Sequence, residues 1–370
     1  QVAGLAEERP LVAGGNGHGC GHNLLGAGAL AGIGYTWLTG AQVPDEKADT
    51  LFVHPDVRRM LMDAKAWIEG LRALCLWGAL QVDLEHNAGT QEERQLAGDL
   101  IGLLTPVIKG VGTDKGYEIA TNAQQVYGGH GYIQEWGMEQ YVRDARIAQI
   151  YEGTNGVQAM DLAGRKLAQN GGRAVMAFGK MVTEEIAAAK QDDATADFAA
   201  RLEKAAGELQ GATMWFMANG MKNPNNIGAG AVPYMHLVGI VAVGLMWLRM
   251  ASAAARLKAA GEGDAAFLNA KLLTARFYAE RIMPDTGALR RKLEAGGEAA
   301  DGAIGLETML SAALRLPPER LREVAEFCRE LADLAAIAVT PRTEPAVPPA
   351  ADEDWVDIRG DGGSGDVTVR

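Results

Sequence analysis

The chain has 370 residues, of which 48% are hydrophobic and 6% aromatic, and it carries a formal net charge of −12 at pH 7. This length predicts two domains with ample apolar residues for a core, and the negative charge excludes general nucleic-acid binding, which needs a basic surface. The three cysteines, Cys20, Cys75 and Cys328, are too few and too scattered for a disulfide framework, so we expect a reducing, cytoplasmic setting.

Apolar residues at helical spacing recur along most of the chain, whereas alternating β-type runs are scarce. The spacing predicts helices at residues 55–76, 92–104, 114–127, 138–150, 156–169, 195–221, 233–260, 265–282 and 318–335. After Gly171-Gly172 the composition changes to alanine-rich, charged helices, which indicates a domain boundary. We therefore predict an all-α fold with helical domains over residues 43–170 and 171–338.

The most apolar stretch, residues 235–250, carries His236 near its start and Arg249 near its end. It is shorter than the roughly 20 apolar residues that a membrane span requires, so it predicts a buried bundle helix and no stable membrane insertion. From Thr340 onward, prolines lead into an acidic, glycine-rich end. This composition predicts a disordered tail over residues 339–370.

Glu152 is the candidate catalytic residue. It follows the apolar residues Ile147, Ile150 and Tyr151, and residues 153–156, Gly-Thr-Asn-Gly, must break a helix directly after it. We expect such a corner to leave the carboxylate poorly solvated, which increases its basicity, as a general base near neutrality requires. The alternative is that Glu152 caps or precedes the following helix, and this short stretch alone favours that alternative.

A glycine-rich turn, Gly128-Gly129-His130-Gly131, lies upstream of this corner. It ends the helix predicted over residues 114–127, because glycine adopts left-handed backbone angles without cost. Thr113 or Asp114 is expected to cap the start of that helix. The glycine pair leaves bare backbone whose N–H groups can bind a phosphate, although such a turn alone is usually only a helix end.

Three linked motifs together resemble the signature of the acyl-CoA dehydrogenase family. They are the turn Gln125–Tyr132, the segment Arg143-Asp144-Ala145 and the corner Ile150–Thr154. The likeness covers about residues 43–307, and its later part resembles the extra helical domain of larger bacterial members. The resemblance implies an up-and-down helical bundle of the family's C-terminal type, followed by a second helical domain.

The resemblance also implies an activity: such enzymes convert an acyl-CoA into a trans-2-enoyl-CoA with FAD as the oxidant. Glu152 matches the residue that removes the proton alpha to the thioester carbonyl. An acyl-CoA substrate, a homo-oligomeric assembly and an electron-transfer flavoprotein as electron acceptor are implied in the same way.

Four residues match the family's FAD contacts. Gln125 and Gly129, with Gly128 beside them, match positions that meet the FAD of a neighbouring subunit, and Thr154 matches a residue near the FAD of its own subunit. Gly156 departs from the glutamine often found at its position.

Residues 1–42 do not resemble this family. A complete member has an N-terminal helical domain and a β domain upstream of the region around His54, and no series of alternating strands precedes His54. We therefore expect the flavin pocket to be only partly encoded, and the start at Gln1 indicates a natural N-terminus further upstream.

Residues 1–32 instead resemble the metal loop of M20 amidohydrolases, with His18, Cys20 and His22 on a glycine-rich segment suited to zinc. The other ligands of that family have no counterpart downstream, so no metal site is predicted. Three hypotheses follow: a flavin-dependent acyl-CoA dehydrogenase, a zinc amidohydrolase, and a non-catalytic helical module that serves oligomerisation.

Overall fold

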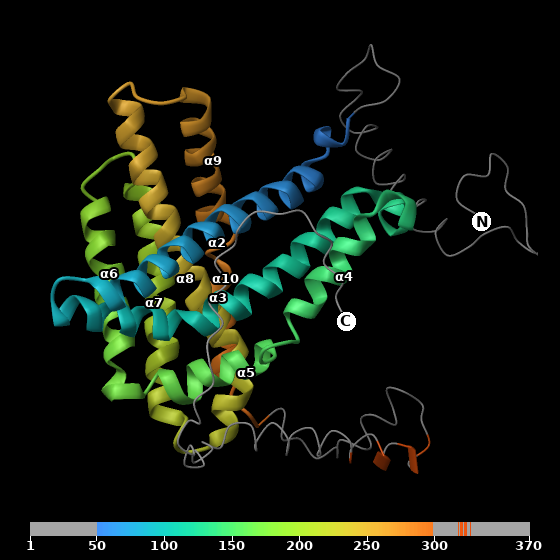
Figure 1. Cartoon of the computed structure of the whole chain (residues 1–370), viewed down its shortest axis with the longest axis vertical. Helices are drawn as coiled ribbons and strands as arrows, with labels where there is room; N and C mark the ends of the chain where they lie inside the picture. The colour runs from blue at the N-terminus through green and yellow to red at the C-terminus, as the bar shows by residue number, and fades with distance from the viewer. Residues whose placement is uncertain (1–49, 299–316, 318, 321, 324–325, 327–370) are drawn as a thin grey trace, which may run out of the picture. The chain divides into compact units, whose positions relative to one another are not determined.

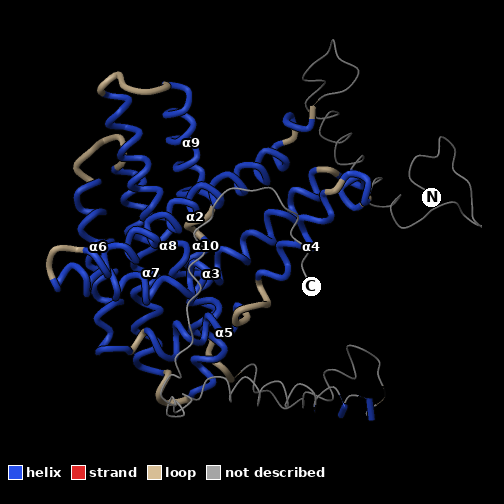
Figure 2. Tube along the Cα trace, viewed as in Figure 1, coloured by secondary structure: helices blue, strands red, loops and turns tan. Residues whose placement is uncertain are grey.

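The computed structural model describes residues 50–298 and, beyond them, residues 317, 319, 320, 322, 323 and 326. The N-terminal segment 1–42, with its metal-loop resemblance at residues 1–32, and the tail 339–370 lie outside the described residues, and the helix predicted over 318–335 lies mostly outside them. Within residues 50–298 every regular element is helical and no strand occurs (Figures 1 and 2), which confirms the all-α prediction. The main helices are α2 (Pro55–Asn87), α3 (Gln91–Val126), α4 (Met138–Ala148), α5 (Asn155–Met160), α6 (Arg173–Ala189), α7 (Ala196–Asn219), α8 (Pro224–Ala259), α9 (Ala265–Arg281) and α10 (Asp285–Glu294).

Short helical turns precede α2 and connect several of the later helices. They are η1 (Leu51–Val53), η2 (Gly128–Tyr132), η3 (Gln134–Trp136), the π-helical turn η4 (Asp161–Lys166) and η5 (Gln169–Gly172). Helix α6 has no counterpart among the predicted helices, although Phe178, Val182, Ile186 and Ala189 form its buried face at helical spacing.

Helix α3 is one continuous helix where the sequence predicts two, at 92–104 and 114–127. Its start carries a capping box, in which Thr90 Oγ1 accepts from Glu93 N at 3.2 Å and Glu93 Oε2 accepts from Thr90 N at 3.1 Å. Thr113 and Asp114 therefore lie in the middle of α3, and the prediction that either caps a helix is wrong.

Pro106 lies inside α3 because another group satisfies the carbonyl that a proline leaves free. Proline has no backbone N–H, so the carbonyl four residues earlier, that of Gly102, loses its helical partner. The Lys166 ammonium donates to this Gly102 oxygen. A side chain that follows α5 thus keeps α3 continuous.

Helix α8 forms the centre of the core, and its middle residues are almost all buried. It begins at Pro224, nine residues before the predicted start at Pro233, because the Asn223 side chain caps it by accepting from Asn225 N at 3.0 Å. Its Trp247 indole donates to the Ala66 carbonyl of α2 at 3.0 Å. The close crossing of these helices requires a glycine at residue 70, where a Cβ would lie 2.5 Å from Val243 Cγ1.

By length and composition alone, α3 and α8 are both apolar enough to cross a membrane. In the most apolar stretch of α8, 78% of the residues are buried within the fold, which confirms the predicted bundle helix, and the corresponding share for α3 is 44%. Helix α8 packs against α2, α3 and α5 as well as α7, α9 and α10. Residues on both sides of the predicted boundary near residue 170 therefore share one core, and the boundary itself stays a prediction.

The far end of α3 and all of α4 extend away from helices α6, α7 and α9 (Figure 1). Helix α4 has no buried residue and packs against α3 and the turns η2 and η3. The residues that the sequence assigns to the functional site lie at the end of α3, in the turn η2 and in the corner between α4 and α5.

Candidate functional site

The corner between α4 and α5 breaks the chain where the sequence predicts. Glu152 and Gly153 have positive φ angles of 51° and 82°, and α5 begins at Asn155. Thr154 is the helix cap, since its Oγ1 accepts from Val157 N at 3.4 Å. Glu152 is therefore not the cap. It holds a left-handed conformation that costs a non-glycine residue roughly 1 kcal/mol or more.

The expected poor solvation of Glu152 is wrong for the described chain. The Glu152 side chain is exposed, and so are Ile147, Ile150 and Tyr151, with 54%, 45% and 52% of their surfaces accessible. The reason is that no described element covers the outer face of α4. Side chains that would desolvate the carboxylate in a closed site instead form part of an open apolar surface.

Asn155, the first residue of α5, is buried and attaches the corner to α3. Its Nδ2 donates to the Gly110 carbonyl at 3.1 Å and to Asp114 Oδ1 at 2.6 Å. Its Oδ1 accepts from Lys109 Nζ at 2.8 Å, and the same ammonium donates to the Gly153 carbonyl at 2.7 Å. The residues on both sides of Thr154 are thereby tied to residues 109–114 of α3.

Asp114 lies at the centre of these hydrogen bonds. Its Oδ1 also accepts from Gln149 Nε2 at 2.6 Å, and its Oδ2 is 2.9 Å from His236 Nε2 on α8. Burial alone would raise the pKa of Asp114, but hydrogen bonds from His236, Gln149 and Asn155 favour the carboxylate and bring the pKa below its usual value. We refer to Lys109, Asp114, Gln149, Asn155 and His236 as the corner network.

The sequence analysis missed the corner network. It assigned Asp114 to a helix start and gave no role to Lys109 or Asn155. Spacing contains one signal, because Lys109 and Thr113, whose hydroxyl also contacts Asn155, are four residues apart and so fall on one face of a helix. Nothing local, however, indicates that this face meets residues 149–155 or His236.

The glycine turn at the end of α3 has the predicted form. Gly128 has a φ of 60°, and a Cβ built on it would meet no atom within 4 Å, so the backbone here is open to a ligand. Gly131 is required for packing, since its Cβ would lie 2.3 Å from the Gln124 carbonyl oxygen. Gln125 and Gly129 are exposed beside it.

The predicted residues form two groups at opposite ends of α4. Gln125, Gly128 and Gly129 precede this helix, whereas Glu152 and Thr154 follow it. The 11 residues of α4 correspond to a length of about 16 Å. One copy of the chain therefore keeps the two groups of predicted residues apart, and we refer to these groups as half-sites. Large side chains on the turns, α4 and the corner are exposed between them: Tyr127, Tyr132, Trp136, Tyr141, Ile147, Ile150 and Tyr151.

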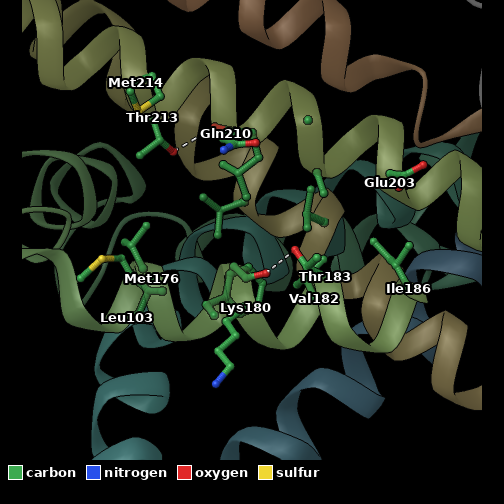
Figure 3. Close-up of a pocket in the computed structure, with 18 of the residues that line it drawn as sticks. Leu103, Met176, Lys180, Val182, Thr183, Ile186, Glu203, Gln210, Thr213 and Met214 are labelled. Carbon is green, nitrogen blue, oxygen red and sulfur yellow. Dashed lines mark hydrogen bonds between the residues drawn. The ribbon is translucent and has the colours of Figure 1, made fainter. Parts of the chain in front are cut away.

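A separate hollow of about 530 Å³ lies between α6 and α7, with α8 beneath it (Figure 3). Its lining includes Phe178, Val182 and Ile186 from α6 and Leu209 and Met214 from α7. None of the predicted site residues lines it. Within the part of the chain that the structure describes, no group of three or more His, Cys, Asp or Glu residues could hold a metal ion.

Two family models match the chain. The model described as "Acyl-CoA dehydrogenase, C-terminal domain" matches residues 26–167, and the model "Acetyl-CoA dehydrogenase C-terminal like" matches residues 178–301. The motifs placed the start of the likeness at residue 43, whereas the first match begins earlier, at residue 26. The matches favour the dehydrogenase hypothesis over the zinc amidohydrolase.

Curated relatives are also similar. The chain is 36% identical to 3-methylmercaptopropionyl-CoA dehydrogenase of Ruegeria pomeroyi over 254 residues, which are 68% of this chain and 43% of that protein. It is 34% identical to the broad-specificity linear acyl-CoA dehydrogenase FadE5 of Mycobacterium tuberculosis, with the same two shares. Among solved structures, Caenorhabditis elegans ACDH-11 in complex with C11-CoA has 17% identity and a TM-score of 0.49, covering 68% of this chain and 38% of that one. The chain spans less than half the length of these relatives.

Proposed function

Because this chain belongs to the acyl-CoA dehydrogenase family, of which it carries the C-terminal helical domains, we propose that it forms the helical part of a flavin-dependent acyl-CoA dehydrogenase. The observation that carries the proposal is the corner itself. Hydrogen bonds fasten the chain on both sides of Glu152, at Gln149 before it and at Gly153 and Asn155 after it. We propose a cytoplasmic location and an electron-transfer flavoprotein as the acceptor.

Glu152 serves as the base that removes the proton alpha to the thioester carbonyl of an acyl-CoA. That proton is weakly acidic, so the carboxylate must lose its contact with water to become basic enough. In the single chain the carboxylate is exposed. The open apolar surface around Ile147, Ile150 and Tyr151 supports a second surface closing over the corner and supplying this desolvation.

The residues of this chain could contact parts of FAD, but they do not form a complete FAD site. The open backbone at Gly128 and Gly129 offers N–H groups to a phosphate, and the Gln125 side chain is exposed beside it. The Thr154 hydroxyl accepts from Val157 N and keeps its own proton to donate. When bound, FAD accepts the beta hydrogen of the substrate as a hydride.

Two copies of the chain are needed to bring these half-sites together. Because α4 separates the glycine turn from Thr154, the turn of one subunit would contact the FAD held by the corner of its neighbour. The exposed aromatic residues between the two half-sites support an oligomer that buries this face, since apolar surfaces of this kind mark interaction sites.

The experiment is reconstitution of the purified chain with FAD, followed by measurement of flavin absorbance and acyl-CoA oxidation. We expect Glu152→Gln to abolish oxidation and to leave flavin binding intact. Glu135→Gln is the control, because Glu135 is an exposed carboxylate on the same projecting surface. A colourless chain that FAD cannot reconstitute would overturn the flavin proposal, and undiminished oxidation by Glu152→Gln would overturn the role of the base.

A further inference from the structure

We infer that Asp114 and His236 are positioning residues that hold the Glu152 corner in its left-handed conformation. His236 lies in the region matched by the second family model, so this region would take part in shaping the site. The role of Glu152 as a base rests on the proposed function. The effect of the two residues on the backbone of the corner does not.

Asp114 fastens the corner symmetrically. Gln149 and Asn155 lie three residues before and three residues after Glu152, and both side chains donate to the same oxygen, Asp114 Oδ1, at 2.6 Å. The backbone closes the same loop, since Asn155 N donates to the Gln149 carbonyl at 3.1 Å. A non-glycine residue with a positive φ persists only where its surroundings over-determine it, and these bonds meet that requirement.

His236 orients the Asp114 carboxylate from the opposite side. It occupies the second oxygen, Oδ2, and so leaves Oδ1 directed at the corner. Its helix cannot shift easily here, because α8 and α3 are in close contact: a Cβ on Gly110 would lie 2.4 Å from Met235 Sδ. His236 therefore transmits the fixed position of the core helix to the corner through a single carboxylate.

Two further charged groups reach this corner: Arg146, whose Nη1 donates to Gln149 Oε1 at 2.8 Å, and Lys109. Arg146 lies on α4 and does not connect the corner to α3. Lys109 lies on α3. Its ammonium holds the Gly153 carbonyl and Asn155 Oδ1 directly, without passing through Asp114. Loss of His236 alone should thus loosen the corner only in part. Loss of the Asp114 acceptor should free the Gln149 flank from α3 and weaken the Asn155 flank, which Lys109 still holds.

The test is hydrogen–deuterium exchange of the full chain, read at the peptide covering residues 149–158. For Asp114→Ala and His236→Ala we expect exchange there to accelerate by roughly tenfold or more, as for a lost hydrogen bond to a charged group. Exchange in the buried middle of α8 should remain slow. His236→Gln should restore part of the protection, because its amide can donate to Asp114 Oδ2.

The matched control is Glu185→Gln. Glu185 on α6 pairs with Arg249, another residue of α8, with Arg249 Nε 2.9 Å from Glu185 Oε2. This variant also removes a polar link to α8 but should leave the corner peptide unchanged. Unaltered exchange of the corner peptide in both the Asp114 and the His236 variants would overturn the inference. Exchange that accelerates equally in all peptides would overturn it too, and so would equal exchange of the corner peptide in His236→Gln and His236→Ala.

Exchange is measured without flavin or substrate, so its result does not depend on the proposed function. If the chain reconstitutes with FAD, both His236 variants should lower kcat without changing the FAD stoichiometry. The variant whose corner peptide exchanges faster, His236→Ala, should lower kcat more than His236→Gln. If the variants loosen the corner but the chain has no dehydrogenase activity, the positioning role is supported and only the proposed function fails.

Discussion

Asp114 Oδ2 on α3 and His236 Nε2 on α8 lie 2.9 Å apart, although 122 residues separate them in the chain. This contact joins the buried core helix to the residue that ties Gln149 to Asn155. The conformation of Glu152 thus depends on a histidine that belongs to the other half of the described structure.

The first prediction concerns backbone strain at Glu152. Because its φ is 51°, Glu152→Gly should relieve backbone strain in the folded state. This gain should offset the loss of stability that comes from the greater conformational entropy of a glycine in the unfolded chain. We expect its free energy of unfolding to stay within about 1 kcal/mol of the original. Glu152→Val should lower it by about 1 kcal/mol or more, since β-branched residues tolerate positive φ poorly. Urea denaturation measures both, and a glycine variant less stable than the valine variant would contradict the assigned conformation.

The second prediction separates two glycines of one turn. Gly131→Ala should destabilise the chain by about 1–3 kcal/mol, because its new Cβ would lie 2.3 Å from the Gln124 carbonyl oxygen and force the backbone to move. Gly128→Ala meets no atom within 4 Å and should cost only about 1 kcal/mol for its positive φ. Thermal or urea unfolding of the two variants checks the order, and the reverse order would show that the turn is not packed in this way.

The third prediction tests how α3 tolerates a proline. Lys166→Met removes the donor to the Gly102 carbonyl and should lower the free energy of unfolding by about 1–3 kcal/mol. In a Pro106→Ala background, residue 106 regains its N–H and can satisfy that carbonyl within the helix. The same lysine substitution should then cost about 1 kcal/mol less, which a double-mutant cycle measures. Equal costs in both backgrounds would exclude this role for Lys166.

The fourth prediction is a pH dependence. Folding lowers the pKa of Asp114 below its ordinary value of 3.8, so the folded state favours the carboxylate more than the unfolded state does. The resulting stabilisation is complete above that ordinary value and is lost as the pH falls through the lower folded pKa. Asp114→Asn should therefore cost about 1–3 kcal/mol near neutrality, and the difference from the original chain should shrink below about pH 3.8. A difference independent of pH between 6 and 3 would contradict the ionised network.

The sequence predicted the local features of this protein well. Helical periodicity identified most helices, and glycine preferences located the turn at Gly128 and the corner at Gly153, because backbone angles depend on the residues present. It erred where distant groups intervene. The continuity of α3 through Pro106 depends on Lys166. The early start of α8 depends on the Asn223 cap, because of which this helix begins nine residues before the predicted start at Pro233.

The sequence by itself thus determined the all-α fold, the family and the position of Glu152 at a helix break, since each of these follows from residues close together in the chain. Only the tertiary structure decided that the carboxylate is exposed, that the two half-sites lie at opposite ends of α4, and that Asp114 contacts both the corner and His236. Solvation and hydrogen bonding between α3, α5 and α8 depend on how helices pack, and residues 122 positions apart leave no trace of that packing in local spacing.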